Sequence, residues 1–425
     1  MALGLFLYQL LTRVLTPFAG LVLRRRVSRG KEDPARLDER FARAAPTRPD
    51  GALIWLHGAS VGESLLLCAL ANQIAASAPG RHFLFTCQTQ TGAQQVKAAI
   101  DAAPNLSGDR CQQLMAPLDL PHVAKRFVSH WRPDLALVAE GDIWPNLLGQ
   151  LKRGGHSAAL INARMTEKSI VGWGRWPRTA ERVFSSFDVI AASDLRTKTG
   201  LTALSKKPVT LVGNLKSALP PPAADETELQ TMRAAIGDRP VLVAASTHDG
   251  EEAIIIDALL SMSPRPFTII APRHPERGDW VASLLDCTTL NIARRSDEEP
   301  IRPDTDILLA DTLGEMGLWY RLADTVYLGG GHAPGVGGHN PIEPLRLGKP
   351  VLTGPSLFNF QDMSEDLLAR GLIRIVETPN DIAEAFPAPP VATASLTALE
   401  QSALDPMSKT LALLAPFLEP RQNST

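Results

Sequence analysis

Short apolar runs that alternate with segments of helical periodicity constrain the fold of this chain more than any other feature. Such alternation is typical of parallel β-strands joined by helical crossovers. We therefore expect an α/β protein. The first series of predicted strands is Ala52–Leu56, His82–Cys87, Gln113–Ala116, Leu135–Ala139, Ala158–Ile161, Val189–Ala192 and Val209–Val212. The second series is Val241–Ala245, Phe267–Ala271, Ile307–Ala310, Thr325–Leu328 and Pro350–Thr353.

The two series predict two Rossmann-like domains. A chain of 425 residues exceeds the roughly 250 to 300 residues at which a single core stops growing. The stretch around Pro220–Pro222 has the composition of an exposed linker. Two parallel sheets facing each other across a cleft would bind a ligand there. The predicted parts are a membrane anchor with its basic flank (1–31), an N-terminal Rossmann-like domain (32–212), a linker (213–224), a C-terminal Rossmann-like domain (225–381) and a helical tail (382–425).

The segment from Ala2 to Leu23 is almost entirely apolar and is followed by a basic cluster. As a helix it would be about 33 Å long, close to the ~30 Å hydrocarbon core of a bilayer. We expect a membrane anchor, with the rest of the chain on the cytoplasmic side, where positive flanks stay. Arg13 lies in the middle of the segment, so a helix in the membrane interface is an alternative to a spanning one. A third alternative is an amphipathic helix that docks on the protein itself. The basic cluster comprises Arg24, Arg25, Arg26, Arg29 and Lys31.

Charge and cysteine content exclude several classes of protein. A formal net charge of −2 argues against a general nucleic-acid binder. The four cysteines form no C-x-x-C pair, which suits a reducing compartment and provides neither a disulfide framework nor a metal site. We therefore expect no metal and no cofactor.

The sequence ALIWLHGASVGES, from Ala52 to Ser64, has the pattern of a strand that ends in a ligand-binding loop. Small residues follow the apolar run, and Gly62 and Glu63 then open a helical pattern. Glu63 would lie at the carboxyl edge of the sheet as a candidate general base. The alternative is a first-turn glutamate that only complements the helix dipole.

A second candidate loop, from Glu140 to Asn146, follows the predicted strand Leu135–Ala139. It carries two carboxylates, Glu140 and Asp142, beside a Trp-Pro pair that restricts the backbone. A site role competes with simple helix capping by Asp142. Lys216 lies where the linker begins and could reach either domain, or it could be a solvated linker lysine.

Four polar or glycine-rich clusters in the second half each follow a predicted strand. Helix N-termini and glycine-rich turns bind phosphate through backbone N–H groups, and an arginine can pair with it. Each cluster alone could be ordinary capping and turn chemistry, but together they predict a nucleotide site. No P-loop motif is present. The candidate binding residues are Ser246, Thr247, His248, Pro272, Arg273, Leu313, Gly314, Glu315, Asn340, Pro341, Ile342 and Glu343.

In this order, the motifs resemble the Kdo transferases (3-deoxy-D-manno-octulosonic acid transferases) of lipopolysaccharide synthesis. The chain differs from the usual family pattern at Gly141-Asp142, where the family has Thr-Glu, and in the loop Gly331–Val336, which is one residue longer. The matching segments are Asp38–Phe41, His57–Glu63, Glu140–Asn146, Asn162–Arg164, Gly213–Lys216, Ser246–Glu252, Pro272–Arg277, Asp311–Glu315 and Gly337–Glu343.

The resemblance implies a GT-B fold with an N-terminal membrane-anchor helix, an acceptor-binding domain at 32–212 and a CMP-sugar-binding domain at 225–381. It implies that Glu63 is the general base and that Glu140 and Lys216 stabilise the transition state, whereas the candidate residues of the second half contact the CMP part of the donor. The family moves Kdo from CMP-Kdo to a lipid A precursor, lipid IVA, at the cytoplasmic face of the inner membrane. We therefore expect CMP-Kdo, a lipid A precursor and the inner membrane as partners, and no nucleic acid.

Three alternatives remain open on the sequence. A sugar-nucleotide 2-epimerase of the same fold would need no membrane anchor. A transferase of the same class could use another nucleotide sugar. A non-catalytic sugar-nucleotide sensor would tolerate the loss of Glu63.

Overall fold

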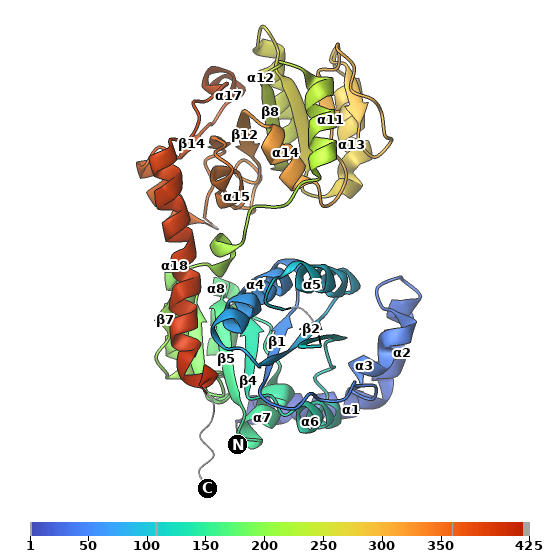
Figure 1. Cartoon of the computed structure of the whole chain (residues 1–425), viewed down its shortest axis with the longest axis vertical. Coiled ribbons are helices and arrows are strands. Elements are labelled where there is room, and N and C mark those ends of the chain that lie inside the picture. The colour runs from blue at the N-terminus through green and yellow to red at the C-terminus, as the bar shows by residue number, and fades with distance from the viewer. Residues whose placement is uncertain (1, 107–108, 359, 420–425) are drawn as a thin grey trace. The chain divides into compact units, whose positions relative to one another are not determined.

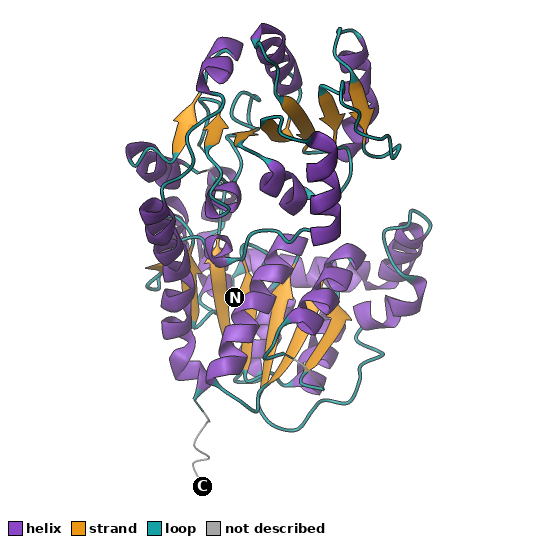
Figure 2. Ribbon diagram, turned by 45° about the horizontal axis from the view of Figure 1, so that its top comes forward, coloured by secondary structure: helices purple, strands orange, loops and turns teal. Residues whose placement is uncertain are grey.

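The computed structural model describes residues 2–106, 109–358 and 360–419, and its contacts divide the chain into two compact units. The first unit comprises residues 1–219 and 403–425, and the second comprises residues 220–402. Each unit is a parallel sheet with helices on both faces (Figures 1 and 2).

The first unit contains a seven-stranded parallel sheet in the order β3-β2-β1-β4-β5-β6-β7. Alternate side chains of β1 enter opposite cores, because successive residues of a strand point to opposite faces: Leu53 and Trp55 lie on one face, Ile54 and Leu56 on the other. The strands are β1 (Leu53–Gly58), β2 (His82–Cys87), β3 (Cys111–Met115), β4 (Leu135–Ala139), β5 (Ser157–Ala163), β6 (Val189–Ala192) and β7 (Thr210–Leu211).

Helices cover both faces of this sheet. One core is closed by α6 (Pro121–Trp131), α7 (Pro145–Arg153), α9 (Pro177–Phe184) and α10 (Leu195–Ser205), with α8 (Glu167–Gly174) beside it. The opposite core is closed by α4 (Val61–Ser77), α5 (Gln90–Ala102) and the last part of α18 (Thr393–Leu418). Short helical turns complete the unit: η2 (Pro34–Arg36), α3 (Leu37–Arg40) and η3 (Leu215–Ala218).

The N-terminal apolar segment is a bent helix that lies along the first unit. It consists of α1 (Leu3–Leu15), the turn η1 (Thr16–Phe18) and α2 (Ala19–Val27). Pro17 lies in the turn, where its missing N–H and its ring interrupt regular helix. Thr12 and Leu23 are buried, while most apolar side chains of the segment are exposed. By length and composition, Leu3–Val27 could cross a membrane.

The second unit repeats the architecture, with the strand order β10-β11-β9-β8-β12-β13-β14, all parallel. Its strands are β8 (Val241–Thr247), β9 (Phe267–Pro272), β10 (Ile292–Arg294), β11 (Ile307–Leu309), β12 (Thr325–Leu328), β13 (Val351–Thr353) and β14 (Ile373–Ile375). One face packs against α11 (Glu226–Ile236), α14 (Met316–Leu322), α15 (Ile342–Arg346) and α16 (Gln361–Ala369), and the other against α12 (Glu251–Ser261), α13 (Gly278–Asp286) and α17 (Pro379–Ala385). A turn, η4 (Pro275–Arg277), precedes α13.

The α/β class and the two parallel sheets agree with the sequence prediction, and the differences are local. The sequence did not predict β10 and β14, two edge strands of three residues each. Residues 213–219 group with the first unit, where Leu215 and Ser217 are buried, so the expected linker begins later, at Pro220. Residues 403–418 of the expected tail likewise belong to the first unit.

Candidate active site

The loop between β1 and α4 holds Glu63 in a fixed orientation. A Cβ at Gly58 would come 3.1 Å from the Cβ of Glu63, so the tight turn at the strand end favours glycine. Ser60 caps α4, since its Oγ accepts a hydrogen bond from the Glu63 N–H at 3.2 Å. The carboxylate in turn accepts bonds from Ser60 Oγ and the Ala59 N–H, both at 2.8 Å. Glu63 therefore fixes the loop that leads into its own helix, and its residual exposure is 8%.

Glu140 and Lys216 form an ion pair beside this loop. Glu140 follows β4 with a left-handed backbone (φ 56°), and its Oε1 lies 2.5 Å from Lys216 Nζ. Asn162, at the end of β5, donates to the same Oε1 at 3.3 Å and accepts from the Leu215 N–H at 2.9 Å. A Cβ at Gly62 would lie 3.6 Å from Lys216 Nζ. The three predicted catalytic residues therefore gather at the carboxyl edge of the first sheet, and Lys216 is not a free linker side chain.

A histidine–carboxylate pair lies at the same sheet edge, with His57 buried and Asp142 partly buried. The sequence analysis weighed Asp142 as a site or capping residue but did not pair it with His57. His57 Nε2 is 2.9 Å from Asp142 Oδ2, and His57 Nδ1 is 2.9 Å from Thr86 Oγ1. Trp55 Nε1 donates to Thr86 Oγ1 at 2.9 Å, and the Thr86 hydroxyl also lies 3.5 Å from the Leu56 carbonyl oxygen. The Trp144 indole N–H donates to His57 Nε2 at 3.0 Å, so Nε2 lies between Trp144 and Asp142.

Asp142 is held as a carboxylate by its neighbours. Burial acts to raise its pKa, but hydrogen bonds from His57, Trp144 and Gln88 outweigh this effect and lower the pKa below the usual aspartate value. The signal in the sequence was a polar residue at each of two strand ends, but His57 and Asp142 are 85 positions apart.

In the second unit, the glycine-rich loop after β12 is fixed by the buried Glu251. Its carboxylate accepts bonds from the N–H groups of His248, Gly330 and His332 and from the Tyr327 hydroxyl. Residues of two loops and of β12 thus converge on one carboxylate at the carboxyl edge of the sheet.

The predicted cluster Ser246–His248 divides into anchoring and exposed parts. Ser246 has a left-handed backbone (φ 55°), and the Thr247 hydroxyl donates to buried Glu252 at 2.8 Å. His248 stacks on His339 with ring centroids 5.1 Å apart, and their Nε2 atoms are 2.8 Å apart. Burial, followed by the positive charge of His248 and Arg273, lowers the pKa of His339 to about 4.

Arg273 presents an exposed guanidinium directly after β9 and Pro272. Its backbone N–H donates to the Thr247 carbonyl at 3.0 Å, which ties the two loops together. Burial raises the pKa of Glu343, and the charge of Arg273 opposes that rise. An arginine near a partly buried carboxylate can meet both a phosphate and sugar hydroxyls.

The other predicted residues of this unit have mainly local partners. Glu315 forms an ion pair with Arg295 at 2.7 Å and accepts a hydrogen bond from the Thr312 hydroxyl. The Leu313 side chain is 80% exposed, and Gly314 has a φ of 89°. Asn340 Oδ1 accepts from the Ile342 N–H at 3.1 Å, next to Pro341, and the Ile342 side chain lies in the core.

The sequence matches a family model described as 3-deoxy-D-manno-octulosonic-acid transferase (kdotransferase) over residues 35–219, the part that holds Glu63, Glu140 and Lys216. The 3-deoxy-D-manno-octulosonic acid transferase of Haemophilus influenzae is 33% identical over 363 residues, 83% of each chain. That of Bordetella pertussis is 33% identical over 383 residues, 87% of each chain. This chain belongs to the Kdo transferase family.

Solved structures show the fold. A glycosyltransferase from Rickettsia africae superimposes with a TM-score of 0.56 at 12% identity, covering 88% of this chain and 100% of the other. The two Rossmann-like units are therefore those of a GT-B type fold. Family membership and fold together identify the chain as a glycosyltransferase that transfers Kdo.

Proposed function

We propose that this Kdo transferase moves Kdo from CMP-Kdo to a lipid A precursor, lipid IVA, at the cytoplasmic face of the inner membrane. In this proposal the anomeric centre is inverted and Glu63 is the general base. The gathering of Glu63, Glu140 and Lys216 at one sheet edge is the observation that carries it.

Glu63 is suited to remove a proton from an acceptor hydroxyl. Ser60 and Ala59 each bond one of its oxygens and fix the direction in which the remaining lone pairs point, as a positioned base requires. The hydroxyl oxygen bonds to the anomeric carbon as the bond to CMP breaks. The hydroxyl proton passes to Glu63, and CMP departs with the bonding electron pair.

Charge on the departing CMP would be met by cations of the chain. Lys216 is held by Glu140, which Asn162 bonds in turn, so its ammonium is already oriented before a substrate binds. Arg273 offers a bidentate contact to the phosphate. We propose that these groups act without a metal ion.

The apolar N-terminal segment and its basic flank support a lipid acceptor that carries negative charge. A soluble 2-epimerase would have no use for such a segment. The residues that distinguish the CMP donor from other nucleotide sugars would lie among Arg273, His248, Glu343 and their neighbours.

The testing experiment measures transfer of labelled Kdo from CMP-Kdo, generated in situ, to a tetra-acylated lipid A precursor. Glu63→Gln should lower turnover by about 10² to 10⁴, or roughly 2.7 to 5.5 kcal/mol, because a general base contributes that much. CMP binding and the unfolding temperature should stay unchanged. Glu181→Gln, an exposed position on α9, is the matched control.

Three results would overturn parts of this proposal. Near-normal turnover of Glu63→Gln would remove Glu63 from the role of base. CMP binding by the wild type without lipid product would exclude this acceptor. Release of a free epimerised sugar would favour the 2-epimerase alternative.

A further inference from the structure

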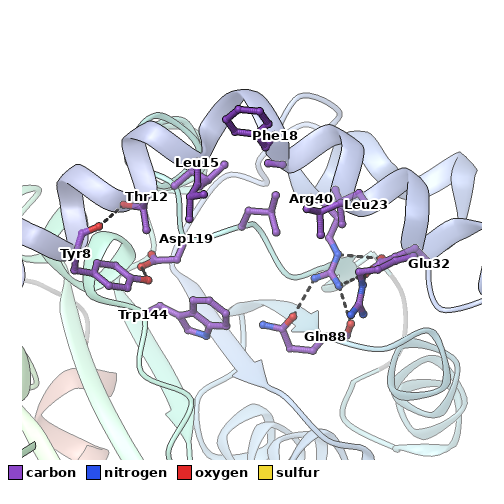
Figure 3. A pocket seen from close by; sticks show the side chains of 15 residues that line it. Tyr8, Thr12, Leu15, Phe18, Leu23, Glu32, Arg40, Gln88, Asp119 and Trp144 are labelled. Atoms are coloured by element: carbon purple, nitrogen blue, oxygen red, sulfur yellow. Dashed lines mark hydrogen bonds and ion pairs between the residues drawn. The ribbon is translucent and has the colours of Figure 1, made fainter.

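The bent N-terminal helix encloses a pocket of about 410 Å³ against the first unit (Figure 3). The helix passes over the pocket, and side chains of α1, η1 and α2 form its roof. The loop between β3 and α6 and the residue Trp144 line the other side. The volume lies within the range of small-molecule and cofactor sites.

The polar groups that line this pocket are already bonded to one another. At one end the Tyr8 hydroxyl donates to Asp119 at 2.9 Å. At the other end Glu32 pairs with Arg40 at 2.8 Å and with Arg26 at 2.9 Å. What the lining offers to a ligand is therefore mainly apolar surface, from Leu15, Phe18, Ala19, Val22, Leu23, Leu118, Leu120 and Trp144.

The roof of the pocket continues onto an exposed apolar face. Leu15, Phe18 and Val22 line the pocket and are also exposed to solvent. Leu7 and Leu10 extend this exposed face along α1. An apolar chain could thus pass from a bilayer into the pocket without crossing water, which is favourable because its surface stays away from water throughout.

The opposite side of the pocket leads to the candidate active site. Trp144 and Gln88 line the pocket, and both hydrogen-bond Asp142, the partner of His57. His57 belongs to β1, whose terminal loop carries Glu63. Hydrogen bonds thus connect the pocket lining to His57, and the loop that follows His57 carries Glu63.

We propose that this pocket binds one fatty acyl chain of the lipid acceptor and so positions the acceptor sugar toward Glu63. The proposal rests on the proposed function. The ligand is an acyl chain because the polar side chains of the lining already bond to one another. The chain belongs to the acceptor because the lining is hydrogen-bonded to Asp142 and His57, next to the candidate active site.

The test fills the pocket. Ala19 lies in its roof, and Ala19→Trp would occupy the space. Val22→Trp does so from an exposed position and is the second variant. Gly20→Trp is the matched control, because a Cβ there meets nothing within 4 Å and Gly20 is outside the lining. Kinetics are measured with the tetra-acylated acceptor and with a fully deacylated one.

Filling the pocket should raise KM for the acylated acceptor about tenfold, the effect of roughly two methylene groups returned to water. The kcat/KM for the deacylated acceptor should not change, and Gly20→Trp should match wild type with both acceptors. An unchanged KM in both filling variants would overturn the pocket assignment while wild-type transfer stands. Absence of transfer to either acceptor by wild type would instead overturn the proposed function.

A second measurement identifies the source of the chain independently of turnover. A lipid A precursor with a diazirine on one acyl chain is photolysed with the full-length protein in phospholipid vesicles. Labelling of Leu118–Leu120 in wild type, absent in Ala19→Trp, is the expected result. Equal labelling of these residues by a diazirine phospholipid that the acceptor cannot displace would assign the pocket to bilayer lipid and overturn the proposal.

Discussion

Lys216 and Glu140 should act as one unit, because the 2.5 Å ion pair makes the position of each depend on the other. We predict that Lys216→Met lowers kcat by about 10² to 10³, the range for losing one charge-stabilising donor. Glu140→Gln should lower kcat by a smaller factor, because the Lys216 ammonium remains but is less firmly positioned. The double variant should be no slower than Lys216→Met, because residues that act together are not additive.

Single-turnover rates of the three variants and of Lys168→Met, an exposed lysine on α8, would check this prediction. Additive losses in the double variant would show that Glu140 and Lys216 act separately.

The His248–His339 pair should make stability depend on pH. The folded-state pKa of His339 is lowered to about 4, from 6.5 when unperturbed. Between these values the unfolded chain binds a proton that the folded imidazole does not, so stability falls as pH drops through this window. The loss at pH 5 should be about 2 kcal/mol. The groups that face His339 are His248, His274, Arg273 and Glu251.

Urea unfolding at pH 7 and pH 5 would measure this loss. His339→Gln removes the titrating group, so the free energy of unfolding should differ less between pH 7 and pH 5. His274→Gln, at an exposed position, should leave that difference unchanged. An unchanged difference in His339→Gln would assign the pH dependence to another group.

At the scale of single residues, the sequence predicted which side chains lie at the site better than how they interact. The sequence singled out Glu63, Glu140 and Lys216 because each lies at a strand end or in a motif, and their catalytic roles stay a prediction. The His57–Asp142 pair was not singled out, because its partners come together only when β1 and β4 lie side by side. The hydrogen bond between Thr247 and Glu252 and the ion pair between Glu315 and Arg295 also depend on tertiary contacts, which a local sequence pattern does not predict.

Among the elements, the buried strands were predictable because they are continuous apolar runs. The runs at β2, β4, β6 and β12 have the same limits in the sequence and in the structure. The edge strands β10 and β14 are short and each contains an arginine, so they carry no such signal. The N-terminal segment was predicted as an apolar helix, and the hydrogen bonds of its inner face agree with the alternative that the helix docks on the protein itself.

That inner face should fix the N-terminal helix to the first unit. The Tyr8 hydroxyl donates to Asp119, and Asn146 Nδ2 donates to the Thr12 hydroxyl at 3.2 Å. We predict that Tyr8→Phe costs about 1 to 3 kcal/mol, because Asp119 loses one of its donors while it stays buried. Hydrogen exchange of the α1 amides in detergent should become faster in Tyr8→Phe.

Leu11→Ala provides the contrast, since Leu11 is exposed on the outer face. It should leave α1 exchange unchanged and weaken binding to vesicles. Slow α1 exchange in Tyr8→Phe would mean that apolar packing alone holds the helix.

In the whole molecule, the C-terminal helix belongs to both units. The contacts assign residues up to 402 to the second unit and those from 403 to the first. Pro406 packs near Gly213, where a Cβ would come 3.1 Å from its Cγ. The sequence indicated a helical tail but not its destination, because an apolar helical face does not specify which core it covers.

This assignment predicts which unit a tail substitution destabilises. Leu414 is fully buried in the core that α4 and α5 close, together with Ile54 and Leu67. Leu414→Ala should therefore lower the free energy of unfolding by about 2 to 5 kcal/mol, the usual range for a leucine cavity. The first unit should be destabilised, although the 183 residues of the second unit lie between Leu414 and the rest of the first unit in the sequence. Leu404→Ala, an exposed position of the same helix, should have little effect. Hydrogen exchange resolved by peptide would check this, with faster exchange in β1 and α4 and unchanged exchange in β8 and α12. Faster exchange in the second unit instead would show that the end of α18 stabilises that unit.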